Sequence, residues 1–537
     1  MSTDIKFDTD ARKRLIDGVE KLAAAVKVTL GPMGKTVAIC RGGDVPHLTK
    51  DGVTVASSIF LEDAYENVGA SLVREAAQRS AAVAGDGTTT STVLASSIIN
   101  NGEKVIAAGH SPVEVLAGMR AAEESVRNVL EEMRVEITAE TLEDVATISA
   151  NGDRKLGKII SQAITRVGPD GAVSVQDAKG YDTSLTVVDG TFVDRGYESP
   201  YFVTDTAKQV AELESPDILI VNDELSAVAP LVPVLEHIAA SGGSLLIVCN
   251  SVTGEALQAL VLNRVKAGLK VCVIKSPEFA SARVTALQDL AALVGAKVLT
   301  DMKEPLNRDE LPQILGSVKK ATVTNKTTLL FGTKQDENIR ERLESAKAIL
   351  DDPSKSPDDK KIADRRPKRL SDGIAVVQVG GATEAEMFER RDRVDDALHA
   401  ARAALRTGVQ PGGGVALTRA RKKVQKRYNA RDSFGAGAIA FLDALEAPLR
   451  QIATNCGVSP DIVIQRVNRI DTRHGYDGKN DRYGDMFELG ILDPHAVVVS
   501  AVEHSLSVAC NLLSIGCIIV EDVNNGVDSD VAYFDNV

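Results

Sequence analysis

The sequence predicts a multidomain α+β protein in which two mainly helical ends flank an α/β centre. The chain has 537 residues, and a single hydrophobic core stops growing at roughly 250–300 residues, so we expect two or more domains. Apolar residues repeat at helical spacing near both ends, whereas short apolar runs alternate with helices between about 190 and 300. We therefore expect the two ends to form one domain, with the middle inserted into it.

The first part of the chain is predicted to be helical. Apolar residues there recur at steps of four, three and four, which is one face of a helix. These residues are Leu15, Val19, Leu22 and Val26. The helix should end at Gly31 and Pro32, and a short β pattern is expected at Val37 and Ile39 and again at Val53 and Val55. A second helix is expected over 64–84, a third from Thr88, and further helix to about 132.

The centre has a different pattern. Continuous apolar runs at 218–221, 245–248 and 271–274 predict a parallel sheet covered on both faces. The polar segment 334–372 predicts a helical excursion with a solvated turn. A long helix is expected from about 384 to Gly408, followed by further Ala-rich helices.

Composition and charge exclude several classes of function. The formal net charge is -13, and an acidic protein gains no counterion-release energy from nucleic acid, so no nucleic-acid partner is expected. The six cysteines form no CxxC pair and are predicted to be free thiols rather than disulfides or zinc ligands. No apolar run approaches the roughly 18 residues that span a bilayer, and the N-terminus has no apolar signal core, so we expect a cytoplasmic protein without a membrane partner.

The segment 29–36, TLGPMGKT, resembles a P-loop but does not have its spacing. A P-loop requires a glycine where Thr29 stands, because the loop must wrap the phosphates. The segment is therefore predicted to be a turn that ends a helix, and a P-loop kinase is disfavoured.

The segment 85–90, GDGTTT, is a better candidate for phosphate binding. Two glycines allow close backbone approach, and three threonines open a helix whose free N–H groups favour an anion. Asp86 could hold Mg²⁺, which proteins usually bind through one or two carboxylates plus phosphate oxygens. A capped helix start is the competing interpretation. The other candidates, Lys50-Asp51-Gly52, Asp395-Asp396 and Asp493 before a proline, are each generic when taken alone.

Taken together, these segments resemble one family. In order, the chain reads VTLGPMGKT, LTKDGVTVA, AGDGTTTSTVLA, TISANGD, GGATEAEM, DDALHAARAA, PGGGVAL, EAPLRQIATNCG and GILDP. This set resembles the group I chaperonins, the bacterial and organellar ring-forming foldases, in collinear order up to about residue 523. The end of the chain, 528–537, differs from the Gly-Met-rich tail that is common in bacterial members. The resemblance is therefore to a divergent member, and a virus-encoded origin is left open.

The resemblance implies a domain division. The equatorial ATP-binding domain would be 1–132 and 408–537, and it would be mainly helical. A small α/β intermediate hinge domain would be 133–188 and 373–407. An α/β apical substrate-binding domain would be 189–372, inserted in the middle of the chain.

The resemblance also implies an ATP site with Mg²⁺ and K⁺. Asp396 would be the catalytic carboxylate that orients or deprotonates the attacking water, assisted by Asp51, and Asp86 would coordinate Mg²⁺. K⁺ is expected near Thr29 and Lys50. The implied nucleotide-binding residues are Thr29, Leu30, Gly31, Pro32, Lys50, Asp86, Gly87, Thr88, Thr89, Thr90, Gly413, Asp477 and Asp493. This chain has Asp477-Gly478-Lys479 where the family commonly has Asn-Ala-Ala near the adenine, which puts nucleotide affinity and base preference in question.

Client binding is implied on two apical helices and a nearby loop. The matching positions are Tyr197, Tyr201, Phe202, Val232, Leu235, Leu257, Val261 and Leu262. An apolar groove of this kind binds non-native chains because it offers apolar area without sequence demands. For a single helix, the competing interpretation is that such residues face the domain core.

The resemblance implies that the partners are copies of the chain in a seven-membered ring, unfolded client proteins and, as an open question, a lid co-chaperonin. Single and double rings both remain open. In double-ring members a carboxylate before a proline pairs across the rings with an arginine. Here the arginine is Arg450, but Ser459 stands at the carboxylate position. The alternative function is a ring that binds and shields clients without productive ATP turnover, and the presence of Asp51, Asp86 and Asp396 disfavours it.

Overall fold

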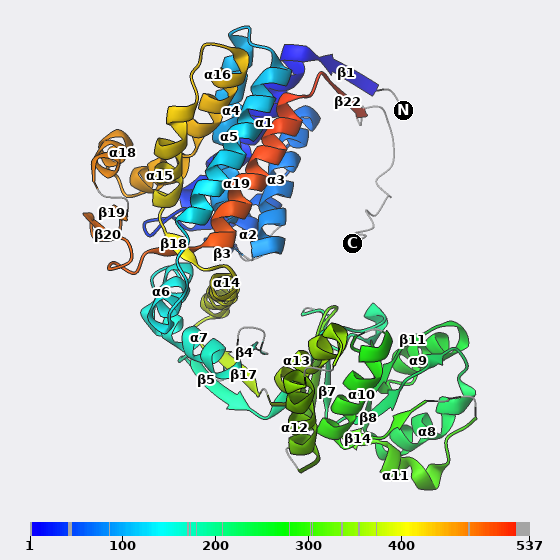
Figure 1. The fold of residues 1–537 in the computed structure, drawn as a ribbon. Helices are drawn as coiled ribbons and strands as arrows, with labels where there is room; N and C mark the ends of the chain where they lie inside the picture. Colours follow the sequence, from blue (N-terminus) through cyan, green and yellow to red (C-terminus); the bar gives the residue numbers. More distant parts are fainter. Residues whose placement is uncertain are drawn as a thin grey trace. The chain divides into compact units, whose positions relative to one another are not determined.

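The structure is a computed structural model that describes residues 3–521, except for 41–45, 85, 169–170, 172, 179, 207, 279, 301, 303, 334–336, 353–354, 372 and 471–472. The C-terminal segment 528–537 therefore lies outside the described residues. The chain folds into two compact units. Unit 1 contains 1–161, 177–183 and 379–537, and unit 2 contains 162–176 and 184–378. In unit 1 the two ends of the chain come together, as Figure 1 shows by the blue and red segments that lie side by side.

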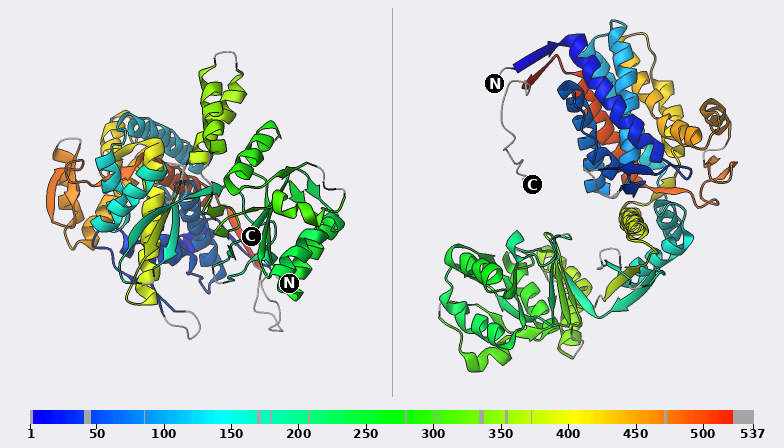
Figure 2. Two further views of the ribbon diagram at one scale, coloured as in Figure 1. Left: turned by 90° about the horizontal axis from the view of Figure 1, so that it is seen from below. Right: turned by 180° about the vertical axis from the view of Figure 1, so that it is seen from behind.

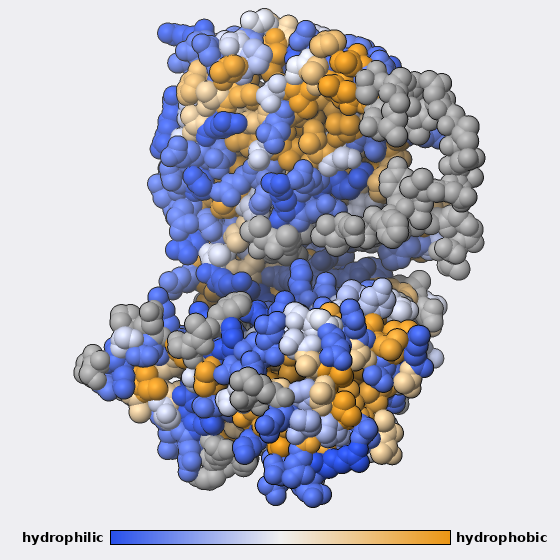
Figure 3. Space-filling view, turned by 90° about the vertical axis from the view of Figure 1, so that its right-hand side faces the viewer, coloured by the Kyte–Doolittle hydropathy of each residue, from blue (hydrophilic) through white to orange (hydrophobic). Residues whose placement is uncertain are grey.

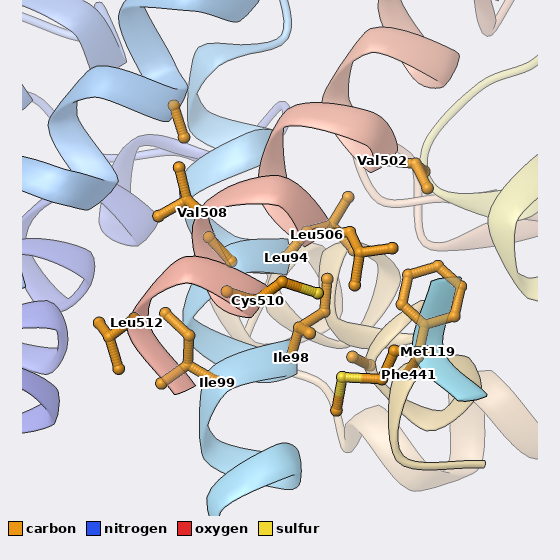
Figure 4. Close-up of a cluster of buried hydrophobic side chains, with 14 of the residues drawn as sticks. Leu94, Ile98, Ile99, Met119, Phe441, Val502, Leu506, Val508, Cys510 and Leu512 are labelled. Carbon is orange, nitrogen blue, oxygen red and sulfur yellow. The ribbon is translucent and has the colours of Figure 1, made fainter. Parts of the chain in front are cut away.

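Unit 1 is built around long helices from both ends of the chain. The main helices are α1 (Asp8–Val26), α3 (Ala64–Ala84), α4 (Thr88–Ala107), α5 (Pro112–Glu132), α15 (Val415–Val424), α16 (Ser433–Ala444) and α19 (His495–Leu513). Their apolar faces form one aliphatic core, and Figure 4 shows the part of it where Leu94 and Ile98 of α4 meet Phe441 of α16 and Leu506 of α19. The helices expected over 64–84 and from Thr88 are confirmed at their predicted bounds.

One helix of unit 1 combines length with an apolar composition. Among the described residues, α19 alone is long and apolar enough to span a membrane, and 67% of that stretch is buried inside the fold. Its buried side chains are part of the core that α4 and α5 share, which accounts for its composition.

Smaller elements complete unit 1. The β1 strand (Thr3–Phe7) pairs antiparallel with β22 (Cys517–Glu521), and β18 (Val409–Pro411) pairs antiparallel with β21 (Leu492–Pro494). Two hairpins are formed by β2 (Val37–Ile39) with β3 (His47–Thr49) and by β19 (His474–Asp477) with β20 (Arg482–Asp485). The remaining helices are α2 (Gly52–Ser57), α6 (Ala139–Ser149), α14 (Glu384–Thr407), α17 (Ala447–Asn455) and α18 (Pro460–Arg469).

The β pattern predicted at Val53 and Val55 is wrong, because both residues lie in α2. The Asp51 carboxylate accepts hydrogen bonds from the backbone N–H groups of Val53 (3.1 Å) and Thr54 (2.8 Å). This N-cap satisfies donors that a helix otherwise leaves open, and it outweighs the weak β preference of two valines.

Unit 2 is α/β. Its central sheet has the order β12 (Lys270–Lys275), β10 (Ser244–Cys249), β8 (Asp217–Val221), β13 (Val298–Leu299), with β14 (Gly316–Ser317) also pairing with β8. The pairs β12–β10, β10–β8 and β8–β13 are parallel, which confirms the parallel sheet predicted from the three apolar runs. Helices α9 (Gly254–Lys266) and α10 (Ala280–Val294) pack against the sheet, and α8 (Val232–Ser241) adds Val234 and Ile238 to the same core.

Two further sheets are formed by other strands of this part of the chain (Figure 2). A four-stranded antiparallel sheet has the order β6 (Gly190–Val193), β16 (Thr328–Phe331), β15 (Lys320–Val323), β7 (Ala211–Glu214). A three-stranded sheet has the order β4 (Val173–Asp177), β17 (Ile374–Val379), β5 (Ser184–Val188). The polar segment 334–372 contains two helices, α12 (Glu337–Asp351) and α13 (Pro357–Ser371), as predicted. Helix α7 (Arg154–Val167) runs from one unit into the other.

Candidate nucleotide site

Unit 1 contains a cavity of about 610 Å³. It is formed where the turn after α1, the start of α2, the N-terminus of α4 and the middle of α14 converge with the β18–α15 turn and β21. The structure places every predicted nucleotide-binding and catalytic residue on its wall. They are Thr29, Leu30, Gly31, Pro32, Lys50, Asp51, Asp86, Gly87, Thr88, Thr89, Thr90, Asp396, Gly413, Asp477 and Asp493.

The N-terminus of α4 forms one wall of the cavity. Gly87 adopts the left-handed conformation with φ 87° and turns the chain into the helix. The first N–H groups of a helix have no intrahelical acceptor, so Thr88, Thr89 and Thr90 present free donors and a positive helix end. The start of α2 approaches this helix end closely, because a Cβ on Gly52 would lie 2.1 Å from Thr89 Oγ1. The start of α2 thus packs against the N-terminus of α4, while its own first N–H groups are capped by Asp51.

The turn after α1 reaches the same cavity. Gly31 has φ 85° and packs against Ile452 of α17, so a side chain at this position would be strained. The Thr29 hydroxyl donates to the Val26 carbonyl oxygen at 2.9 Å, which continues the helix end into the turn. The helix stop predicted here is therefore also a wall of the cavity.

Asp51 is held firmly in place. Besides its two backbone bonds to α2, its Oδ2 accepts from Thr54 Oγ1 at 2.6 Å. The carboxylate therefore caps a helix and lines the cavity at the same time. A group fixed by three donors is preorganised, and its remaining lone pairs face a ligand without reorganisation.

Asp86 is a partly buried carboxylate beside Gly87. Burial raises its pKa, Asp51 raises it further, and hydrogen bonds from the Gly87 N–H and Ser149 Oγ act in the opposite direction. A buried carboxylate next to other carboxylates needs a positive charge to be stable when ionised. Oxygen ligands on a tight turn suit Mg²⁺, which takes one or two carboxylates and completes its shell with waters and phosphate oxygens. Among the described residues, no group of three or more His, Cys, Asp or Glu side chains is placed to hold a metal ion without other ligands.

Helix α14 brings Asp396 to the cavity. Burial, followed by the charges of Asp86 and Asp51, raises the pKa of Asp396 to about 9. Asp392 lies one helical turn earlier and also lines the cavity, and burial and Asp51 raise its pKa. The neighbouring Asp395 is not on the cavity wall, and burial raises its pKa to about 6.

Asp493 closes the cavity from β21. Burial and the charge of Asp86 raise its pKa to about 7, although a hydrogen bond from the Gly413 N–H acts in the opposite direction. The turn before α15 has to be glycine here, because a Cβ on Gly412 would lie 2.9 Å from Asp493 Oδ1. The GGG motif therefore allows the backbone to approach this carboxylate.

Some cavity residues were not predicted. Ser149, Asn151 and Asp392 all line the wall. The TISANGD segment is one of the family motifs, but the sequence predicts no role for it. In the structure its Ser149 donates a hydrogen bond to Asp86. Asp392 could have been found from its position four residues before Asp396, since residues at i and i+4 share a helix face.

Asp477 lies on the wall, but its carboxylate is directed into its own hairpin. It accepts from the Lys479 and Asn480 N–H groups at 3.1 and 3.3 Å, from Asn480 Nδ2 at 2.7 Å and from Arg482 Nε at 2.9 Å. These four donors leave it no free lone pair for direct contact with a ligand. Its contribution to the site is the shape of the β19–β20 turn.

The predicted client-binding residues lie in unit 2, and their exposure differs widely. Val232, Leu262 and Tyr201 are exposed by 38%, 52% and 68%. Leu235 is buried but lines a groove of about 420 Å³ at the ends of α8 and α9, which Val232 also lines. Other members pack against the core of unit 2: Tyr197, Leu257 and Val261 are partly buried, and Phe202 is fully buried. The structure thus brings part of the set to the surface and places Phe202 inside.

Comparisons with known proteins agree with this geometry. The model of the TCP-1/cpn60 chaperonin family matches residues 22–523 of this chain. Among solved structures, the chain is similar to the chaperonin gp146 from the bacteriophage EL 2 (Pseudomonas aeruginosa), crystallised in the presence of ATP-BeFx. Crystal form II matches with a TM-score of 0.71 and form I with 0.65. Each match has 21% sequence identity and covers 96% of this chain and 99% of gp146.

Proposed function

The chain belongs to the TCP-1/cpn60 chaperonin family, and on that premise we propose that it is an ATPase that captures non-native proteins on apolar apical surfaces and promotes their folding in a ring cavity. The observation that carries the proposal is the cavity of unit 1, in which Asp51, Asp86, Asp396 and Asp493 converge beside the N-terminus of α4. Free helix N–H groups and paired carboxylates suit a nucleotide triphosphate bound with a divalent cation.

Each carboxylate has a distinct part in this proposal. Asp86 and the α4 N-terminus would hold the metal and the phosphates, where Mg²⁺ supplies the charge that offsets developing negative charge. Burial and the neighbouring carboxylates raise the pKa of Asp396 to about 9. The positive charge of Mg²⁺ would lower this pKa, so that Asp396 would be ionised and able to accept a proton from the attacking water. Asp51 is fixed by its helix cap and would assist by orienting that water. K⁺ near Thr29 and Lys50 remains part of the proposal.

Apolar side chains on unit 2 support client capture. Val232 on α8 and Leu262 and Val265 on α9 are exposed by 38%, 52% and 63%, and Tyr201 lies in the loop between β6 and β7. Exposed apolar groups in one unit offer a non-native chain area without a sequence requirement. Phe202 is left out of this surface because it is buried.

Exposed apolar strands in unit 1 support assembly into a ring. The β1–β22 pair is a two-stranded ribbon with open edges, and its Ile5, Phe7 and Ile519 are exposed by 43%, 62% and 62%. Figure 3 shows apolar residues gathered in the upper part of the molecule, seen from the side on which β1 and β22 lie in Figure 1. Isolated two-stranded ribbons are marginal in water, so pairing with a neighbouring copy would stabilise them. We propose the seven-membered ring, the equatorial, intermediate and apical division at the boundaries given above, and a cytoplasmic location, in a host cell if the chain is virus-encoded.

Two assays on the purified protein test the proposal. Phosphate release from ATP should be measurable and should rise when a denatured client is added, and refolding of that client should require hydrolysable ATP. Client shielding without phosphate release would instead support the alternative of a ring that binds proteins without productive turnover. Absence of both activities would contradict the proposed function.

A further inference from the structure

Three buried serines meet behind the cavity wall that the N-terminus of α4 forms. Ser80 of α3, Ser91 of α4 and Ser505 of α19 are each 0% exposed. The three helices that carry this serine cluster pack against one another, as Figure 1 shows. A buried hydroxyl costs free energy unless it is hydrogen-bonded, so the partners of the three serines show what the cluster holds in place.

The hydrogen bonds of the serine cluster have a defined direction. Ser91 Oγ donates to the Gly87 carbonyl oxygen at 2.9 Å, which uses the one hydrogen of that hydroxyl. Ser80 Oγ lies 2.7 Å from Ser91 Oγ, so Ser80 is the donor in this contact. Ser505 Oγ donates to the carbonyl oxygens of Ser91 (2.8 Å) and Ala501 (2.5 Å). Ser91 is therefore held by α3 at its side chain and by α19 at its backbone, and its own hydroxyl holds Gly87.

The carbonyl oxygen of Gly87 accepts two bonds from one residue, because the Ser91 backbone N–H also donates to it at 2.9 Å. A peptide group is planar and trans, so its C=O and N–H point in opposite directions. The N–H of this peptide group belongs to Thr88, which lines the cavity, and it is one of the donors that the start of α4 leaves open. Bonds that fix the Gly87 carbonyl therefore also fix the direction of the Thr88 N–H.

Gly87 needs this support because glycine is the residue with the most backbone freedom. It has φ 87°, and a Cβ at this position would lie 2.7 Å from Val497 Cγ1 of α19, so a side chain that would restrict the backbone does not fit. A serine that bonds to the carbonyl four residues earlier is common in helices. Here Ser80 also donates to that serine, and hydrogen bonds in a chain strengthen one another.

We propose that Ser91, supported by Ser80, is a positioning residue of the nucleotide site. Its hydroxyl fixes the peptide group between Gly87 and Thr88, so that the Thr88 N–H is oriented for a phosphate oxygen before the ligand binds. A donor that is already oriented binds an anion without the entropy cost of ordering it. The inference rests on the proposed function, because it assumes that phosphates bind at the N-terminus of α4.

The test measures the Kd for Mg-ADP by calorimetry on the full-length protein, with stability followed in parallel by urea denaturation. Ser91→Ala should raise the Kd about threefold to tenfold, which corresponds to the net contribution of one hydrogen bond. Ser244→Ala is the matched control. Ser244 is 2% exposed and donates to the Glu214 carbonyl oxygen at 2.8 Å in unit 2, so this variant loses a comparable buried bond and should leave the Kd unchanged.

A double variant separates positioning from a general loss of stability. Ser91→Ala alone leaves the buried Ser80 hydroxyl without its acceptor, whereas Ser80→Ala combined with Ser91→Ala removes both hydroxyls and should be closer to wild type in stability. We expect the double variant to bind Mg-ADP as weakly as Ser91→Ala does. Wild-type affinity in either variant would overturn the inference and leave the proposed function intact. A wild-type protein that binds no Mg-ADP would refute the nucleotide site, and the inference with it.

Discussion

Ser149 Oγ donates a hydrogen bond to Asp86 Oδ2 at 3.2 Å. Ser149 is the last residue of α6, and Asp86 stands at the turn that opens α4. The contact joins two segments that are 63 residues apart in the sequence. It means that the carboxylate expected to meet a metal ion is oriented by a second element, so a change in the position of α6 reaches the phosphate end of the cavity directly.

Removing this bond should weaken nucleotide binding. In Ser149→Ala the Asp86 carboxylate loses one of its two donors, and a hydrogen bond to a charged group is worth about 1.5–3 kcal/mol. We expect the Kd for Mg-ADP to rise about tenfold or more by calorimetry. Ser356→Ala removes a comparable bond, from Ser356 Oγ to Asp359 Oδ2 at 2.8 Å in unit 2, and should leave binding unchanged. Unchanged affinity in Ser149→Ala would show that Asp86 does not need this orientation.

The client surface can be tested with exposed positions only. Leu262→Glu should leave ATP turnover intact and abolish suppression of client aggregation, because a charge in the contact area adds a desolvation cost that an apolar client cannot offset. Val284→Glu, on α10 at 42% exposure, is the matched control. Leu235→Glu is a poor test, since this residue is only 8% exposed and the charge would destabilise the core of unit 2. Normal aggregation suppression by Leu262→Glu would place the client surface elsewhere.

The raised pKa of Asp395 predicts that the protein loses stability as the pH rises. Its pKa is near 3.8 in the unfolded chain and about 6 in the folded state, because of burial. Between these values the folded state keeps a proton that the unfolded chain has released, so the free energy of unfolding falls as the pH rises and is then constant above about pH 6.

Asp395→Asn removes this penalty without changing the shape of the side chain. The variant should therefore be more stable than wild type at pH 8, by on the order of 2 kcal/mol, and the difference should vanish near pH 4. Urea denaturation at the two pH values measures this. Asp309→Asn, at an exposed position of unit 2, should have no comparable effect. A variant that is less stable than wild type at pH 8 would contradict the assignment.

Arg450 bears on how rings associate. Its guanidinium contacts Asp461 Oδ1 at 2.6 Å and Glu446 Oε2 at 3.1 Å in its own chain. An arginine that is engaged in this way, with Ser459 in place of a carboxylate, does not offer a cross-ring ion pair. One exposed pair is worth only about 0–1 kcal/mol, but seven copies add up. We expect native mass measurements with ATP and with ADP to show seven-subunit particles. Fourteen-subunit particles alone, in both states and at low protein concentration, would contradict this.

The long helices and the parallel sheet could be predicted from the sequence, whereas one short helix of the site could not. Long helices such as α3 and α4 were predicted correctly because a periodic apolar face and glycine breaks leave few alternatives. The short α2 was missed, because its formation depends on the Asp51 cap and not on its valines. The parallel sheet of unit 2 was predictable because its strands are buried on both faces and read as continuous apolar runs.

The limits of prediction lie where tertiary contacts decide the role of a side chain. Asp477 lies on the cavity wall, as predicted, but its carboxylate accepts hydrogen bonds from residues of its own hairpin, and these contacts depend on the hairpin geometry. Phe202 was expected at the surface, yet it is fully buried in unit 2. Ser149 showed no local signal of its own, since its partner Asp86 is distant in sequence.

The most direct test of the central claim is phosphate release by Asp396→Asn at saturating ATP, with nucleotide affinity measured in parallel. Asparagine resembles the protonated carboxyl group that burial favours here, so the variant should fold and bind Mg-ATP with nearly wild-type affinity. The account predicts that the rate of phosphate release falls by about 10²–10⁴-fold, because a positioned general base is lost. Release at the wild-type rate with ATP binding intact would contradict the claim that this cavity hydrolyses ATP through Asp396.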